Sequence, residues 1–115
     1  MPYLLIQSNK AVSETERSRL LSDSLKIVAA ALNKPEKYVM AVWAPAPMIF
    51  FDGDTKDAVF LEVRSIGIPE SARAKMPGAL AKCMAEYLGV STDRVFLVMT
   101  DVPGKYWAQG EQTFG

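Results

Sequence analysis

The sequence repeats itself at a spacing of 56 residues, and this internal repeat restricts the fold more than any other feature. Without gaps, the offset superposes identical residues along two segments. The pairs are Leu5 with Leu61, Glu14 with Glu70, Arg17 with Arg73, Lys26 with Lys82, Ala29 with Ala85, Leu32 with Leu88, Val39 with Val95 and Val42 with Val98. We expect two copies of one structural unit, at about residues 2–45 and 58–101. Since 115 residues do not divide usefully into two cores, both should share a single domain spanning residues 1–115.

Each copy is predicted to be a β-α-β unit. In the first, an apolar strand at 2–6 precedes a helix that begins at Ser13, where Glu16 has the capping-box spacing. Apolar residues then recur every three to four positions until Asn33, Lys34 and Pro35 stop the helix, and a second strand follows at 38–44.

The second copy follows a loop at 45–57 that is rich in Pro, Gly and Asp. It is predicted to contain a strand at 58–65, a helix at about 69–88 closed by Gly89, and a strand at 95–100. Because Pro77 and Gly78 interrupt the helical pattern, we expect a kink or a restart there.

Two such units define an α+β fold, a four-stranded mixed sheet with two helices on one face. Right-handed crossovers place both helices on the same side of the sheet. The strands are apolar at nearly every position and look mainly aliphatic, which suits a sheet covered on both faces. No third layer is available in the chain, so we expect a homo-oligomer whose sheets face one another.

Composition excludes several kinds of chemistry. The chain has no histidine and one cysteine, so metal sites with nitrogen ligands, Cys-x-x-Cys motifs, and Ser-His-Asp or Cys-His catalysis are ruled out. Thirteen basic and thirteen acidic residues give a net charge of zero, and an aliphatic sheet face disfavours a nucleic-acid-binding β-α-β-β-α-β domain. No stretch resembles a secretory signal or a membrane span, so the expected compartment is the cytoplasm.

Pro2 is the residue that points to catalysis. Removal of Met1 by a methionine aminopeptidase would leave a secondary amine at the start of a buried strand. Burial and a nearby cation both lower the pKa of an amine, which could make this group a base near neutral pH, as proton abstraction beside a carbonyl requires. The alternative is that Pro2 only begins a strand.

Five motifs in order resemble the macrophage migration inhibitory factor family. They are Pro2, Lys34-Pro35 with Tyr38, Ser65-Ile66-Gly67, Asp93-Arg94-Val95 and Thr113-Phe114. This resemblance covers essentially the whole chain. It implies the trimeric tautomerase fold, a homotrimer with three active sites between neighbouring subunits, and cofactor-independent tautomerisation of keto and enol acids such as phenylpyruvate.

The resemblance also implies a role for each matching residue. Pro2 would act as general base and then as general acid. Lys34 would bind the substrate carboxylate and keep the Pro2 amine neutral, and the backbone of Ile66, at an open strand end, would hydrogen-bond to the substrate. The apolar walls would be Tyr38, Trp107 and Phe114, although each could equally be ordinary core or interface.

Departures from the family pattern affect the same site. Phe96 and Val98 stand where mammalian members usually carry a tyrosine and an asparagine, so an aromatic wall remains but two polar groups are lost. Gln109 replaces a pocket tryptophan, while Trp107 lies two positions earlier. We expect proton transfer with altered substrate preference. The alternative is a cytokine-like binding protein on the same scaffold, with weak or vestigial catalysis.

Overall fold

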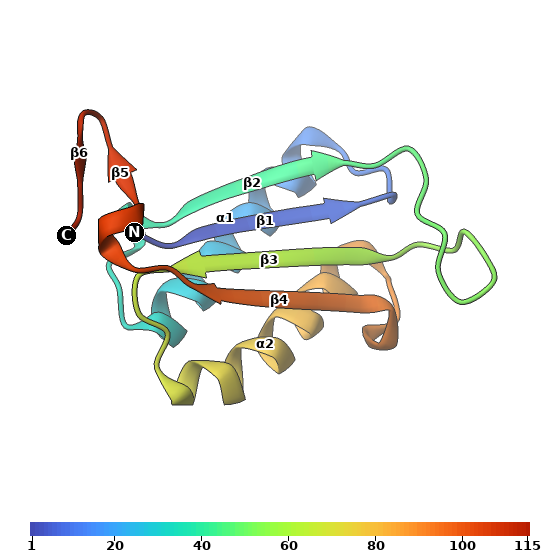
Figure 1. Cartoon of the computed structure of the whole chain (residues 1–115). Coiled ribbons are helices and arrows are strands. Elements are labelled where there is room, and N and C mark those ends of the chain that lie inside the picture. Colours follow the sequence, from blue (N-terminus) through green and yellow to red (C-terminus); the bar gives the residue numbers. More distant parts are fainter.

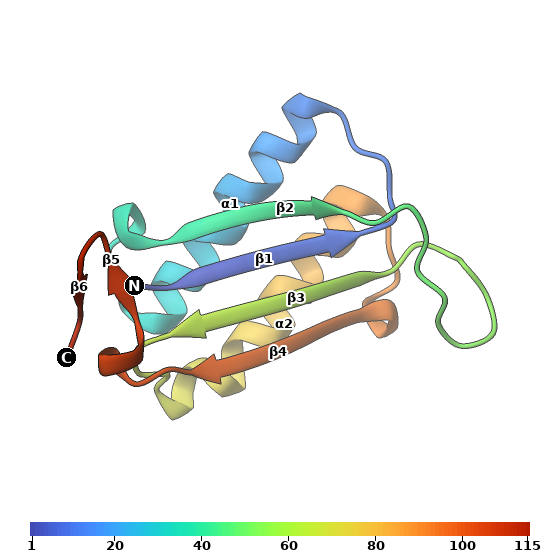
Figure 2. The same ribbon diagram turned by 45° about the horizontal axis from the view of Figure 1, so that its top comes forward.

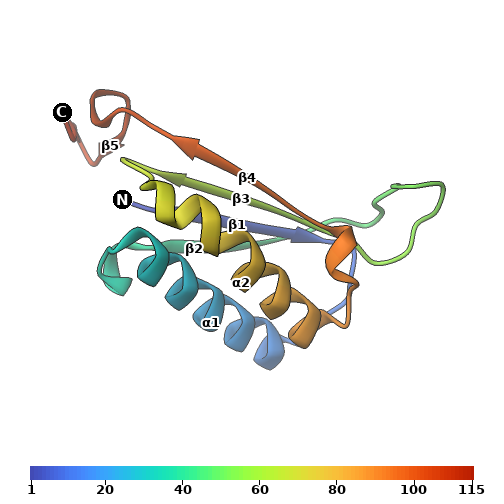
Figure 3. The ribbon, with the colours of Figure 1, turned by 90° about the horizontal axis from the view of Figure 1, so that it is seen from below.

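A computed structural model describes residues 1–115 and shows two helices packed against one face of a four-stranded sheet (Figure 1; Figure 3). The main elements are β1 (Tyr3–Ser8), α1 (Glu14–Leu32), β2 (Met40–Pro45), β3 (Val59–Ser65), α2 (Glu70–Leu88) and β4 (Val95–Asp101). Single 3₁₀ turns lie at η1 (Glu36–Tyr38), η2 (Thr92–Arg94) and η3 (Gly104–Tyr106), and a C-terminal hairpin is formed by β5 (Ala108–Gln109) and β6 (Gln112–Thr113). The hairpin was not predicted.

The sheet has the order β2-β1-β3-β4. β1 pairs parallel with β2, and β3 pairs parallel with β4, because a helix crosses over between the members of each pair. β1 and β3 are antiparallel and join the two units at the centre (Figure 2). The predicted α+β architecture, with a mixed sheet and both helices on one face, is therefore confirmed.

Both helices have 19 residues, and their ends follow the expected chemistry. The Ser13 side chain accepts a hydrogen bond from the Glu16 N–H at 3.2 Å, and Asn33 and Gly89 close the helices in the left-handed conformation. Of the two alternatives predicted at Pro77 and Gly78, the restart is wrong, because α2 runs unbroken through both residues. A kink there stays a prediction. Proline lacks one backbone donor, and the fully buried Met76 and Leu80 on either side hold this turn in the core.

The alternation of side chains along each strand gives the sheet one buried and one open face. The buried face packs against α1 and α2 and contributes to a core of 17 residues. The open face has no cover within the chain, since the chain supplies no third layer. It leaves Met40, Phe60, Phe96 and Val98 between 41% and 56% exposed. Both faces of the sheet are therefore largely apolar, as predicted, but the chain covers only one of them.

The open face is less aliphatic than predicted. Phe60 and Phe96 are neighbours across β3 and β4, and Arg64 donates to Glu62 at 2.6 and 2.8 Å on the same face. Because residues two apart share a face, Phe60, Glu62 and Arg64 must lie in one row along β3.

Neither helix is long and apolar enough to cross a membrane.

The two copies are out of step by one residue in their first strands. The offset of 56 pairs Leu5 with Leu61, yet Leu61 is fully buried against the helices whereas Leu5 lies on the open face. With an offset of 57, the buried positions of β1 and β3 correspond to each other, and Ser8 aligns with Ser65 in the sequence. The cause is the link from strand to helix, which spans residues 9–13 in the first unit and the shorter range 66–69 in the second.

Candidate functional site

Pro2 lies buried directly before β1, at the end of the sheet where the chain begins (Figure 1). Its carbonyl accepts a hydrogen bond from the Met40 N–H at 3.0 Å, so β2 fixes the backbone at this position. While Met1 is attached, the Pro2 nitrogen is an amide without a basic lone pair. The amino group of the chain then belongs to Met1, which is partly buried.

Lys34 lies close enough to this amino terminus to influence it. The pKa of the Met1 amine is lowered, chiefly because burial disfavours the charged form and also because of the positive charge of Lys34. The Lys34 backbone is held by a hydrogen bond to the Ala29 carbonyl at 2.9 Å, just after the left-handed Asn33. Its side chain is half-buried and takes part in none of the ion pairs of the chain, so the ammonium group is available for an anion.

Ile66 follows the end of β3, in a turn that the Asp101 side chain stabilises. The Asp101 carboxylate, at the end of β4, accepts hydrogen bonds from the N–H groups of Gly67 and Ile68 at 2.9 and 3.0 Å. The Val102 N–H donates to the Ser65 carbonyl at 2.8 Å. The backbone of Ile66 makes no backbone hydrogen bond within the chain and can bind a ligand. β3 is a central strand, so the opening is at the strand end and not at a lateral edge of the sheet.

The C-terminal segment folds back on itself at the same end of the sheet. The Phe114 N–H donates to the carbonyls of Gly104 and Trp107 at 3.1 and 3.0 Å. Beside it, Trp107 lines an open hollow of about 330 Å³ with Tyr3, Arg64 and Tyr106. Trp107 and Phe114 are thus brought together near the residue that follows Pro2.

Several of the predicted site residues do not line this hollow. Pro2, Lys34, Tyr38 and Phe114 do not line it. Tyr38 ends the turn η1 and is 47% exposed, with the Lys37 ammonium 5.1 Å from its ring centre. These predicted residues therefore lie at one end of the sheet, without forming one enclosed pocket in a single chain.

Phe96 and Val98 lie elsewhere on the open face. Phe96 pairs with Phe60, and Phe60 pairs with Gln7, which is five residues along β1 from Pro2. Five residues of extended strand span about 17 Å. Val98 is similarly two strands away from β1, beside Glu62. Neither residue of a chain can therefore contact a small substrate held at the Pro2 of the same chain.

Sequence reasoning missed four residues at this end of the sheet. Tyr3 and Arg64 are cross-strand partners, and their place in the hollow depends on a pairing register that the sequence did not reveal. Tyr106 follows from the unpredicted C-terminal fold. Asp101 gave a usable signal, since an aspartate at a strand end commonly accepts hydrogen bonds from a neighbouring turn.

Comparisons with known proteins agree with this geometry. The family model described as macrophage migration inhibitory factor (MIF) matches residues 1–115. A macrophage migration inhibitory factor homolog of Wuchereria bancrofti is 29% identical over 117 residues, covering 100% of both chains.

Among solved structures, macrophage migration inhibitory factor of Toxoplasma gondii aligns with a TM-score of 0.93 and 33% identity, covering 97% of this chain and 99% of the other. A homologue from Prochlorococcus marinus gives a TM-score of 0.90 and 30% identity, covering 98% and 99%. The fold defines the class, an α+β protein of the tautomerase superfamily. Within that class, the chain belongs to the macrophage migration inhibitory factor family.

Proposed function

We propose that this protein is a cofactor-independent keto–enol tautomerase that acts on phenylpyruvate-like 2-keto acids, with Pro2 as the proton carrier. One observation carries the proposal. The amino terminus lies in a partly buried position beside an unpaired lysine, and both features lower the pKa of the Met1 amine. Once Met1 is removed, the Pro2 amine would lie next to this position and near the same lysine. A lowered pKa keeps more of an amine in the neutral form, which is the form that accepts a proton from carbon.

The chemistry begins when Met1 is removed, because Pro2 then carries a secondary amine with a free lone pair. This amine takes the proton from the carbon next to the keto group, and the electron pair of the C–H bond moves towards the carbonyl oxygen. The protonated Pro2 returns a proton to that oxygen, which completes the enol and regenerates the base. The reverse sequence converts the enol into the ketone.

Lys34 and Ile66 would orient the substrate for this exchange. The Lys34 ammonium binds the carboxylate of the keto acid through a charge-assisted hydrogen bond. The unpaired backbone of Ile66 offers a further hydrogen-bonding group next to the end of β3. Tyr38, Trp107 and Phe114 supply apolar surface, which excludes water and strengthens the interaction with Lys34.

We propose further that the functional form is a homotrimer in which a neighbouring subunit completes each site. Two observations support an oligomer: the open sheet face leaves several large apolar side chains exposed, and Phe96 and Val98 are too far from Pro2 within one chain. A head-to-tail arrangement of this kind closes into a ring. Phe96 and Val98 would then be the residues contributed by the neighbour.

The test compares the wild-type chain with Pro2→Gly, both confirmed by intact mass to lack Met1. We expect the wild type to tautomerise phenylpyruvate and the variant to be slower by about 100-fold or more, the usual contribution of a positioned acid–base group. Equal rates would refute the assignment of Pro2. A wild type with no activity on phenylpyruvate or hydroxyphenylpyruvate would instead favour the cytokine-like binding protein.

A further inference from the structure

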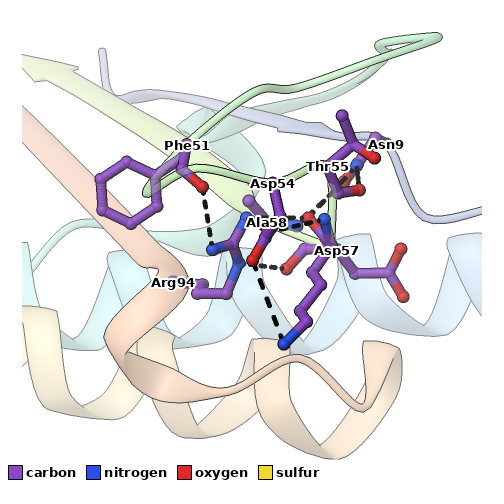
Figure 4. A network of polar contacts seen from close by, with 8 residues as sticks. Asn9, Phe51, Asp54, Thr55, Asp57, Ala58 and Arg94 are labelled. Carbon is purple, nitrogen blue, oxygen red and sulfur yellow. Dashed lines mark hydrogen bonds and ion pairs between the residues drawn. The ribbon is translucent and has the colours of Figure 1, made fainter.

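One arginine makes several of the contacts that hold the loop between β2 and β3 (Figure 4). Arg94, at the end of η2, donates to the carbonyls of Phe51, Lys56 and Asp57 at 3.2, 3.0 and 3.1 Å. Its guanidinium also forms an ion pair with Asp54 at 3.2 Å, and only 12% of its side chain is exposed. A rigid fork of five donors suits this task, because a single group can satisfy several carbonyls of one loop.

Phe51 is held both through its backbone and through its ring. It pairs with Asp54 across a turn in which Asp52 and Gly53 have φ values of 53° and 82°, as in a type I′ turn. The Arg94 guanidinium carbon lies 5.2 Å from the centre of the Phe51 ring. The rings of Phe51 and Phe96 meet edge to face, with centres 4.9 Å apart and planes at 80°.

These two rings form part of an entirely apolar hollow. Its volume is about 300 Å³, and the aromatic residues in its lining are Phe50, Phe51, Phe60 and Phe96. Phe50 is 72% exposed and Phe51 is 37% exposed, so the hollow is open to the surroundings. No side chain in the lining can donate or accept a hydrogen bond. A flat hydrocarbon group would therefore fit this surface better than a polar one.

We propose that Phe51 is a specificity-determining residue and that Arg94 is the residue that positions it. This inference rests on the proposed function, in which Phe96 of one subunit completes the site of its neighbour. Phe51 touches Phe96 and shares its hollow, so it enters that composite site together with Phe96. The two rings form a hydrocarbon wall against which an unsubstituted aromatic ring of the substrate packs.

The wall should distinguish phenylpyruvate from 4-hydroxyphenylpyruvate. A ring hydroxyl placed against Phe51 and Phe96 would lose hydrogen bonds to water, and no side chain that lines the hollow can replace them. The discrimination of an apolar pocket against such a group stays moderate. We expect kcat/KM to favour phenylpyruvate by about 10-fold.

The experiment measures kcat and KM for both substrates in the full-length protein lacking Met1, and the affinity for 3-phenylpropionate by calorimetry. We expect Phe51→Ala to raise KM for phenylpyruvate and Kd for 3-phenylpropionate by about 5- to 30-fold, through loss of one aromatic contact, with kcat nearly unchanged. The preference for phenylpyruvate should shrink at the same time. Met48→Ala is the matched control, since Met48 is exposed in the same loop but does not line the hollow.

Arg94→Gln should reproduce the effect of Phe51→Ala on KM and substrate preference, and Arg94→Lys should be intermediate because lysine lacks the fork. Asn9→Ala is the control for a purely structural role. Asn9 bonds to Thr55, Lys56 and Ala58 in the same loop without touching Phe51. Equal shifts in KM for Asn9→Ala and Arg94→Gln would remove the positioning role of Arg94.

An active wild type whose KM, preference and 3-phenylpropionate affinity are unchanged in Phe51→Ala would overturn this inference and leave the proposed function intact. A wild type without tautomerase activity would defeat the proposed function itself. In that case, 3-phenylpropionate binding that is weakened in Phe51→Ala would still support an aromatic-binding surface, and unchanged binding would end both proposals.

Discussion

The two β-α-β units share a scaffold but differ at the positions that matter for chemistry. At an offset of 56 their helices place buried residues at the same points. These pairs are Leu20 with Met76, Ser24 with Leu80, Val28 with Met84 and Leu32 with Leu88. Beyond the helices the units diverge. Lys34, half-buried and unpaired, corresponds to Val90, which is buried in the core. Repeated positions thus maintain the fold, and the unmatched positions carry the candidate function.

The two units also differ at the last residue of the 3₁₀ turn that precedes the second strand of each unit. Tyr38 of the first unit corresponds to Arg94 of the second. Tyr38 is exposed at the end of the sheet where Pro2 lies, whereas Arg94 fastens the loop between the units. The first unit contains the proposed proton carrier and the carboxylate-binding group. The second unit contributes Phe60 and Phe96 to the aromatic surface, and the loop that Arg94 holds contributes Phe50 and Phe51.

The largest expected effect tests the shared scaffold. Leu20→Ala and Met76→Ala should each lower the free energy of unfolding by about 2–5 kcal/mol, because both side chains are fully buried at equivalent points of the core. Urea denaturation measures the two losses. If only one of the two variants is less stable, the two helices do not contribute equally to the stability of the core.

The next prediction separates Lys34 from Val90. Lys34→Ala should raise KM for phenylpyruvate about 10-fold or more, since a hydrogen bond to a charged group contributes about 1.5–3 kcal/mol, while the free energy of unfolding changes little. Val90→Ala should do the reverse, lowering stability by about 1–3 kcal/mol through a small cavity with KM unchanged. An unaltered KM in Lys34→Ala would remove this residue from the site.

The pH dependence should also respond to Lys34. The neutral amine is the reactive form, so kcat/KM should rise with pH through the pKa of Pro2. Because the Lys34 charge helps to lower the pKa of the amino terminus, Lys34→Ala should move this rise to higher pH. Burial, the larger cause, remains in the variant. A rise that stays in place or moves to lower pH would contradict the electrostatic role.

The smallest expected effect concerns the helix starts. Ser13 caps α1 with its side chain, whereas Pro69, at the equivalent place before α2, makes no such hydrogen bond. Ser13→Ala should lower the free energy of unfolding by about 1 kcal/mol. Urea denaturation measures this loss. An unchanged midpoint would show that the capping hydrogen bond contributes nothing to stability.

Much of the fold could be predicted because local patterns determine it. The capping spacing of Ser13, the stop at Pro35 and the glycine at 89 marked the helix ends to within one or two residues. The repeat then required two parallel pairs joined in one sheet. The error in the first strands has a simple cause, since identity at a fixed offset does not show that a connecting loop is one residue shorter.

The candidate site could be predicted only in part. Pro2 emerged because a secondary amine at the start of a chain is unusual. Lys34 emerged only from the resemblance to the macrophage migration inhibitory factor family, since a lysine after a helix is ordinary. The positions of Tyr3 and Arg64 depend on which residues face one another across strands, and this register is set by tertiary packing. The role of Arg94 was equally hidden, because its partners are backbone carbonyls of a distant loop.

The role of Pro2 is tested most directly by comparing the phenylpyruvate tautomerase rate of chains that begin at Pro2 with that of chains that retain Met1, each confirmed by intact mass. Activity should be confined to chains that begin at Pro2, because only they carry a basic nitrogen at that position. Equal activity in both forms would show that the nitrogen of Pro2 does not carry the proton.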